Sequence, residues 1–339
     1  MNVVKKFVKA REFTSFLFLV ALFVIVGAIN PSFLTLDNIS ACFNSSVVYT
    51  LIAVGMAFAI FIGEIDVSVG STMGLSAAVA GTMIQNGSNW FLAFLVAILI
   101  GIVVGLVNGW GVAVMKIPSL IFTLGTNGIL RGMMYLQVGA EQVNNLPKEF
   151  KDISSMTLVG SFTIYYCCAV VLAVAIHFLL TRTKRGRYFI AVGDNASGAE
   201  LVGIPATRTK VMAYLICGVL SAVAGIIFAS RIGIVTSLSG NGYEMKAVAA
   251  CVLGGISLSG GVGSVIGAGI GAVIMASISY LLVFMGFSSN YDNAITGVIL
   301  ITIVVADALM QRRAAANNRH ARLAARTSAA PGGKEGLEQ

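Results

Sequence analysis

Charged residues are scarce in this chain of 339 residues: only 11% are Asp, Glu, Lys or Arg, whereas a soluble domain has about 25%. Hydrophobic residues make up 57% of the chain, and apolar windows of about 20 residues recur along it, the length that crosses a hydrocarbon core of about 30 Å. Because lipid offers backbone N–H and C=O groups no partners, such long unbroken runs must be helical. The sequence therefore predicts an all-α polytopic membrane protein.

Motifs for nucleotide, metal and covalent chemistry are also missing. No Gly-x-x-x-x-Gly-Lys-[Ser/Thr] sequence occurs, so the chain carries no phosphate-binding loop of that kind. The two histidines, His177 and His320, lie far apart, and the five cysteines show no metal-ligand spacing. No run of carboxylates suggests a proton relay. We therefore predict no enzyme activity and no catalytic, cofactor-binding or metal-binding residues.

Ten apolar segments are long enough to be considered membrane spans, and they are residues 13–30, 45–63, 70–86, 90–115, 118–137, 159–181, 209–231, 244–260, 263–286 and 292–310. We expect them to form one transmembrane domain, residues 13–310, preceded by a short segment, residues 1–12. The basic tail, residues 311–339, is rich in Ala, Asn and Arg and then in Pro and Gly, a composition typical of disorder.

Lysine and arginine gather in alternate loops, and short cytoplasmic loops carry the excess of these residues in membrane proteins. With the N-terminus inside the cell, only five of the 22 lysines and arginines fall outside or within spans, namely Arg131, Lys148, Lys151, Arg231 and Lys246. We therefore expect both termini in the cytoplasm. The net charge of +8 follows from this topology and does not indicate nucleic-acid binding. We expect the basic tail to be solvated, and contact with anionic lipid is the alternative.

Two glycine-rich interruptions occur at corresponding places in the two halves of the chain. Residues 63–71 separate the second and third spans, and residues 254–264 separate the eighth and ninth. Such paired interruptions indicate a transport pathway, and two sets of five spans predict an inverted pseudo-repeat. Close helix packing through small residues is the alternative. The glycines assigned to the breaks are Gly63, Gly70, Gly254, Gly255, Gly260 and Gly261.

Several polar side chains in or beside the spans are candidates for lining the pathway. A charge at the centre of a span costs about 2.5–3.5 kcal/mol, so such residues usually line water or form pairs. A sugar-sized solute would instead be held by amides, hydroxyls and aromatic faces. We expect Glu244 and Asp292 at the outer interface. The pathway candidates are Asn44, Asp66, Thr123, Thr126, Asn127 and Arg131, and for each hydroxyl or amide a helix-packing hydrogen bond is the alternative.

A polar loop, residues 182–208, lies between two spans, and we expect it in the cytoplasm. Asp194 and Asn195 can cap a short helix that begins at Ala196 and ends before Gly203. The small residues of this helix are a poor lipid anchor but suit the docking of another protein; an amphipathic helix on the lipid surface is the alternative. The loop residues that matter most are Gly193, Asp194, Asn195, Ala196, Ala199 and Gly203. The outer loop, residues 138–158, is also expected to hold a short helix.

At these residues the chain resembles the permease subunits of bacterial ABC importers of the ribose/xylose/arabinose class, from about residue 12 to residue 310. The resemblance rests on Glu-Ile-Asp-Val-Ser-Val-Gly at 64–70, Lys-Ile-Pro at 116–118 with Thr-Leu-Gly at 123–125 and Arg-Gly at 131–132, Gly-Asp-Asn at 193–195, and Gly-Gly at 254–255 and 260–261. The stretch 244–255 is most similar to permeases that import the furanosyl signal autoinducer-2, and permeases for rhamnose-like sugars are also similar.

The resemblance implies a dimer of identical or sister permease chains in the bacterial inner membrane, with a periplasmic or extracellular sugar-binding protein. Two cytoplasmic ATPase domains, on separate subunits or in one tandem chain, would bind ATP and Mg²⁺, so this chain would hold no cofactor. Residues 194–203 would form the coupling helix that sits in a groove of the ATPase. A self-contained secondary transporter is the alternative function. The absence of a carboxylate relay from the sequence argues against it. A structural scaffold would leave the paired breaks unexplained.

Overall fold

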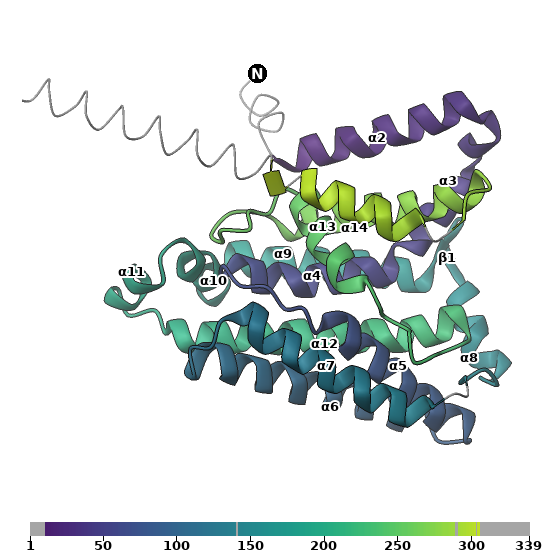
Figure 1. Ribbon diagram of the computed structural model, residues 1–339. Coiled ribbons are helices and arrows are strands. Elements are labelled where there is room, and N and C mark those ends of the chain that lie inside the picture. Colours follow the sequence, from purple (N-terminus) through teal and green to yellow (C-terminus); the bar gives the residue numbers. More distant parts are fainter. Residues whose placement is uncertain (1–10, 140–141, 289–290, 303, 306–339) are drawn as a thin grey trace, which may run out of the picture.

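The computed structural model describes residues 11–139, 142–288, 291–302 and 304–305. The basic tail expected at 311–339 and most of the N-terminal segment lie outside the described residues. The longer helices shown in Figure 1 are α2 (Arg11–Ile29), α4 (Val47–Phe61), α5 (Val69–Gln85), α6 (Trp90–Gly109), α7 (Ser119–Val138), α9 (Ile164–Arg182), α12 (Ala206–Ile232), α13 (Tyr243–Leu253) and α14 (Val265–Phe284).

Shorter elements connect these helices. They are η1 (Pro31–Leu34), α3 (Leu36–Ser45), the π-helix η2 (Trp110–Val114), α8 (Lys148–Asp152), η3 (Ile153–Ser155), β1 (Thr157–Val159), β2 (Phe162–Thr163), α10 (Lys184–Asp194) and α11 (Ala196–Leu201). Each of the first nine predicted apolar segments coincides with one of the longer helices, and residues 292–302 of the tenth are helical.

Four helices in the described part of the chain are long and apolar enough to cross a membrane: α6 continued by η2, α9, α12 and α14. The pair α3 and α4, bent by 41°, makes a fifth candidate. Helix α5 has 17 residues and α13 has 11, which is shorter than the roughly 20 residues of a straight span. The predicted class, an all-α polytopic membrane protein, fits these helices, and by length and composition four to five of those in the described residues qualify as spans.

Two predicted segments begin or end elsewhere than the apolar pattern indicates. Helix α9 starts only at Ile164, because β1 and β2 form a hairpin before it and the Thr163 side chain accepts a hydrogen bond from Tyr166 N. Helix α13 stops at Leu253, where Gly254 packs closely on Gly267 of α14. Both differences arise from contacts between segments rather than from hydropathy.

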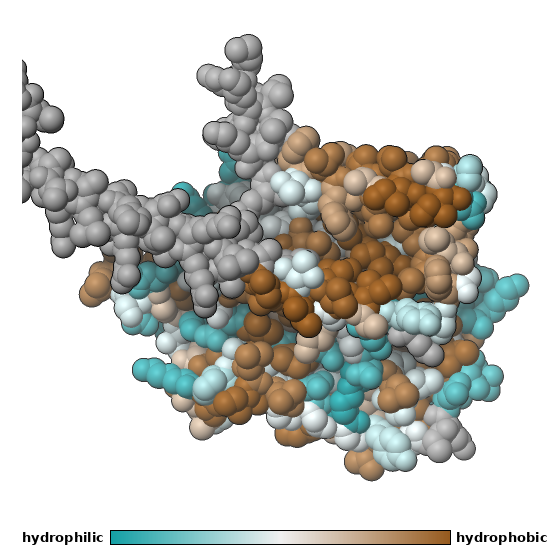
Figure 2. All heavy atoms as spheres, turned by 45° about the horizontal axis from the view of Figure 1, so that its top comes forward, coloured by the Kyte–Doolittle hydropathy of each residue, from teal (hydrophilic) through white to brown (hydrophobic). Residues whose placement is uncertain are grey.

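Helix α12 forms the centre of the fold and packs against α4, α5 and α6 (Figure 1). Its contact with α6 depends on small residues: an added Cβ on Gly218 would clash with the carbonyl oxygen of Gly101. Apolar side chains also cover the outside, and Figure 2 shows them gathered over the face around α2, where Leu17, Val24 and Ile25 are exposed. An apolar exterior around a packed core is what a lipid surrounding requires.

The two ends of the molecule differ. Figure 1 shows α10 and α11 at one end and α8 with β1 at the other. The short helix expected in residues 138–158 is present as α8. Its loop is fastened to the end of α12, because Val143 pairs with Val235 and the Ser230 hydroxyl donates to Phe150 O at 2.7 Å.

Candidate functional site

The two predicted helix breaks lie against each other at the end that carries α10 and α11. The amide of Gly261 in the second break donates to Phe61 O, at the end of α4, at 3.0 Å. Gly63, Gly260 and Gly261 all have positive φ, at 76°, 84° and 71°, which favours glycine. An added Cβ on Gly260 would also lie 2.8 Å from Gly63 N. Glycine is therefore needed here for both conformation and contact.

Gly193, next to the last residue of α10, completes this contact. An added Cβ on Gly193 would overlap the carbonyl oxygen of Phe61, and one on Gly261 would lie 2.9 Å from Asp194 Cα. We call Phe61, Gly63, Gly193, Gly260 and Gly261 the glycine junction. It joins the predicted docking loop to both helix breaks through backbone contacts, an arrangement that the sequence alone did not predict.

The other predicted break glycines are also close-contact positions. Gly70 lies within α5, beside Gly240, and an added Cβ on Gly70 would clash with Gly240 O. Gly254 ends α13 against Gly267, and Gly255 follows with a φ of 84°. Gly70 therefore serves helix packing rather than interrupting a helix, whereas Gly254 and Gly255 end one.

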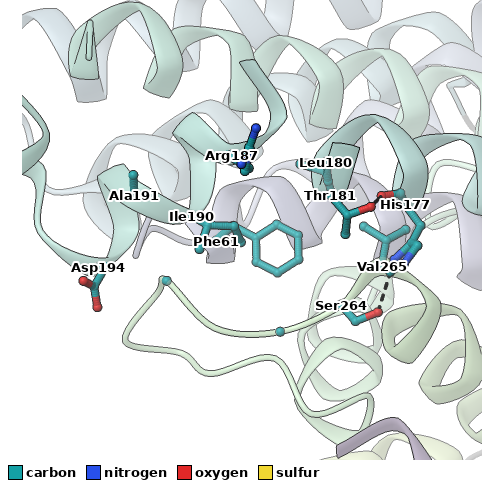
Figure 3. Close-up of a pocket in the computed structure, with 12 residues that line it drawn as sticks. Phe61, His177, Leu180, Thr181, Arg187, Ile190, Ala191, Asp194, Ser264 and Val265 are labelled. Atoms are coloured by element: carbon teal, nitrogen blue, oxygen red, sulfur yellow. Dashed lines mark hydrogen bonds between the residues drawn. The ribbon is translucent and has the colours of Figure 1, made fainter. Parts of the chain in front are cut away.

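A cavity of about 530 Å³ lies beside the glycine junction, between α9, α10 and the start of α14 (Figure 3). In its wall, His177 of α9 lies beside Ser264, with 3.5 Å between Nδ1 and Oγ. Arg187 and Asp194 of α10 contribute one charge of each sign to its wall. The opposite signs give the cavity no clear preference for a charged ligand. The cavity leaves free space beside α10, next to the second break.

Helix α11 forms the tip of the loop. Asn195 caps it as predicted, because its Oδ1 accepts a hydrogen bond from Gly198 N at 2.8 Å. The helix ends at Leu201, slightly earlier than expected. Ala199 is buried and Ala196 packs against the core, so these small residues face the chain's own body. The apolar residues exposed at the tip are instead Leu201 and Val202, at 89% and 76% exposure.

A buried polar cluster joins the first break to α6 and α7. The Asp66 carboxylate accepts hydrogen bonds from Ser68 N at 2.9 Å, Ser68 Oγ at 2.6 Å and Asn108 Nδ2 at 3.3 Å. Asn108 Oδ1 in turn accepts from Thr126 Oγ1 at 2.8 Å. We call these four residues the Asp66 network. Because all four are buried, the network holds the first break against α6 and α7, as buried and fully paired polar groups do.

Three predicted pathway residues thus come together: Asp66 and Thr126 in the network and Thr123 beside it, where Thr123 Oγ1 accepts from Val67 N at 3.1 Å. Asn108 was missed, although an amide within an apolar span is itself a signal. Two other candidates bond elsewhere: Asn44 bonds Ser161 O and Thr163 N, and Arg131 donates to Ser239 O. Asn127 follows Thr126 in α7, and its buried Oδ1 has no hydrogen-bond partner among the described residues.

An ion pair ties the first break to the start of α12. Lys210 Nζ lies 2.6 Å from Glu64 Oε1, and both side chains are about one-fifth exposed, at 23% and 19%. A cavity of about 300 Å³ beside the pair is also lined by Lys116 and by Glu200 of α11. The segment from α10 to α12 therefore contacts the first break twice, through Gly193 and through Lys210.

A second ion pair lies toward the α8 end and joins Lys246 of α13 to Asp292. The side chain of Asp292 is only 14% exposed, because the pair packs within the protein. The Lys246 ammonium also lies 5.4 Å and 5.6 Å from the ring centres of Tyr49 and Tyr243. Reasoning from sequence did not pair Lys246 with Asp292, because nothing in the sequence relates the two positions.

Paired helix breaks in a helical membrane protein are typical of a transport pathway. Residues 38–304 match the family described as branched-chain amino acid transport system, permease component, and the chain belongs to this family. The expected resemblance to importer permeases is thereby confirmed.

Individual relatives are similar along nearly the whole chain. The autoinducer 2 import system permease protein LsrC of Enterobacter sp. (strain 638) is 38% identical over 332 residues, covering 98% of this chain and 96% of that protein. The proteins of the same name from Salmonella typhi and Klebsiella pneumoniae are 39% and 38% identical, covering 88% and 93% of this chain and 85% and 91% of theirs. No solved structure matches the chain significantly.

Proposed function

We propose that this chain is the membrane subunit of an ATP-driven importer that moves a small sugar-like solute, with autoinducer 2 as the first candidate, into the cytoplasm. The observation that carries the proposal is the 38% identity to an autoinducer 2 import permease over 98% of the chain. The family description names branched-chain amino acids instead, so the relatives and the description favour different solutes. The near full-length similarity favours the sugar-like one.

The proposed assembly contains a second permease chain, identical or sister, two ATPase domains that bind ATP and Mg²⁺, and an extracellular or periplasmic sugar-binding protein. It lies in the bacterial inner membrane with both termini in the cytoplasm. All ten apolar segments, arranged as an inverted pseudo-repeat within residues 13–310, would contribute to the membrane domain. The helices that coincide with the first nine segments support a helical membrane domain over this range.

The glycine junction supports a route from the ATPase to the helix breaks. An ATPase bound to the exposed tip, Leu201 and Val202, would move α11 and α10 together. Because Gly193 of α10 abuts Phe61 and Gly261 directly, such a movement reaches the end of α4 and the second break. ATP would then favour one conformation of the permease through its differential affinity for the two.

Gly203→Trp is expected to abolish binding of the ATPase and to lower uptake at least about tenfold, equivalent to about 1.4 kcal/mol. Gly203 is exposed beside the tip with a φ of 82°, and an added side chain would project into open space. The measurement is ATPase activity that co-purifies with the tagged chain, together with uptake of labelled autoinducer 2.

Gly87→Trp is the matched control, because Gly87 has a φ of 80° and equally open surroundings in the loop between α5 and α6. Equal losses in both variants would mean that backbone strain, not docking, explains the result. Uptake that persists without any ATPase and collapses with an ionophore would replace the proposal with a self-contained secondary transporter.

Reversing the charge of Glu64 tests whether its ion pair with Lys210 contributes to coupling. Glu64→Lys would oppose two cations where a 2.6 Å ion pair now lies, and we expect less solute moved per ATP hydrolysed. The double variant Glu64→Lys/Lys210→Glu restores opposite charges and should recover much of the loss. Glu149→Lys, at an exposed position of α8, is the control, and a double variant no better than Glu64→Lys would exclude a pairing role.

A further inference from the structure

A further cavity lies at the opposite end of the molecule from the glycine junction. It measures about 240 Å³ and is enclosed by α3 and α4, the end of α12, the start of α13, and α14. Its polar and aromatic lining comes from Ser45, Tyr49, Phe228, Arg231, Tyr243, Ser279 and Tyr280. The volume equals that of roughly eight molecules of liquid water and falls below the range of about 300–1,000 Å³ typical of drug-sized ligands. The cavity therefore suits a small molecule.

Arg231 supplies the only positive charge in the described lining of this cavity. Its side chain is half-buried, and within the described residues its guanidinium has no hydrogen bond or ion-pair partner. A guanidinium offers five N–H donors in a planar fork and accepts none. An arginine in a membrane domain normally finds a partner or faces a functional cavity. The free donors of Arg231 can therefore bind a ligand that presents neighbouring oxygen atoms.

The aromatic wall is fixed by charges that are already paired. The rings of Tyr49 and Tyr243 stack with 5.1 Å between centres. Lys246 lies over both rings and is itself bonded to Asp292, whose other carboxylate oxygen accepts from Ser279 Oγ at 2.9 Å. Lys246 and Asp292 therefore satisfy each other and hold the rings, while Arg231 stays available.

The described lining contains no carboxylate. An amino acid would bring an ammonium group, whose burial without a counter-charge is costly. A sugar-like ring has an apolar face that can lie on a tyrosine and neighbouring oxygens that a guanidinium can bind in pairs. The chemistry of the lining thus distinguishes between the two solute classes that the family description and the individual relatives suggest.

We propose that this cavity binds the transported solute and selects a small polyhydroxylated ring: the Arg231 fork holds two neighbouring oxygens, neutral or anionic, and the apolar face of the ring lies against the tyrosine wall. This assignment rests on the proposed import function and names its substrate class. It makes Arg231 and Tyr49 binding residues, and Lys246 a positioning residue.

The test is concentration-dependent uptake by the complete transporter with its ATPase and binding protein, using autoinducer 2 and D-ribose as sugar-like probes and leucine as the amino-acid probe. Arg231→Met should raise the KM about tenfold or more, as expected for loss of hydrogen bonds from a charged group. Arg231→Lys, which keeps the charge but not the fork, should fall between the two. Lys148→Met, which removes an exposed charge on α8 at the same end, should leave the KM unchanged.

Tyr49 provides an independent variant in case Arg231→Met does not assemble. Tyr49→Leu removes the ring and should raise the KM, whereas Tyr49→Phe keeps the ring and should preserve it. An unchanged KM in both Arg231→Met and Tyr49→Leu would overturn the site. Competition by leucine would overturn the substrate class. ATP-dependent uptake of neither sugar-like probe by the unaltered transporter would instead contradict the proposed function itself.

Discussion

Replacing Gly193 by valine is expected to reduce import about a hundredfold, equivalent to about 2.7 kcal/mol. An added Cβ would occupy the position of the Phe61 carbonyl oxygen, and Gly261 N lies close to the same point. Because both neighbours are backbone atoms, no change of rotamer can relieve the clash. Helix α10 would have to move away from the end of α4, and the Gly261 N to Phe61 O hydrogen bond of 3.0 Å would be strained or lost.

The measurement is uptake by the reconstituted transporter compared with its ATP hydrolysis. We expect an assembled complex that hydrolyses ATP without moving solute, because the ATPase-binding tip is retained while its contact with the breaks is displaced. Gly269→Ala in α14 is the matched control, since an added Cβ there meets nothing within 4 Å. Import by Gly193→Val at the unaltered rate would show that the glycine junction does not carry the coupling.

Replacing Lys246 by methionine is expected to destabilise the protein by about 3 kcal/mol, the lower end of the range for breaking a buried ion pair. The lower end applies because the Asp292 side chain keeps 14% of its exposure. The substitution leaves that carboxylate without its counter-charge and removes the cation that lies over the Tyr49 and Tyr243 rings. Thermal unfolding in mild detergent measures the loss.

The second substitution separates charge from packing. Lys246→Met/Asp292→Asn removes the uncompensated charge and should regain part of the stability, whereas Lys184→Met, at an exposed position of α10, should change little. If Lys246→Met had the same unfolding temperature as the unaltered protein, the Lys246–Asp292 pair would be too well solvated to contribute to stability. A double variant as unstable as Lys246→Met would assign the loss to packing on the tyrosines.

Helices were predictable wherever a long apolar run dictates them. Local capping was predictable too, as Asn195 shows, because a cap depends on residues a few positions apart. Helix α10 differs from the predicted polar loop, because Lys, Arg and Gly at its start are typical of a loop. Its buried Phe189 and Val192, three positions apart, are the helical signal that was overlooked.

Contacts between distant segments explain why the site could be predicted only in part. The chemistry of their side chains predicts that Asp66, Thr123 and Thr126 line the pathway. They do come together, but in a buried network that includes Asn108 rather than along an open path. Apolar helices resemble one another, so a single sequence does not tell which of them are neighbours. The glycine junction and the Lys246 to Asp292 pair depend on that information.

Helix α12 runs unbroken between the two ends of the protein. Its 27 residues span about 40 Å, more than the roughly 30 Å of a hydrocarbon core. One end holds Glu64 through Lys210, and the other holds the α8 loop through Ser230. Close contact with α6 at Gly218 stiffens it between these points. A displacement of the α8 loop, as by a docked partner, would therefore be transmitted along α12 to the first helix break at the opposite end of the molecule.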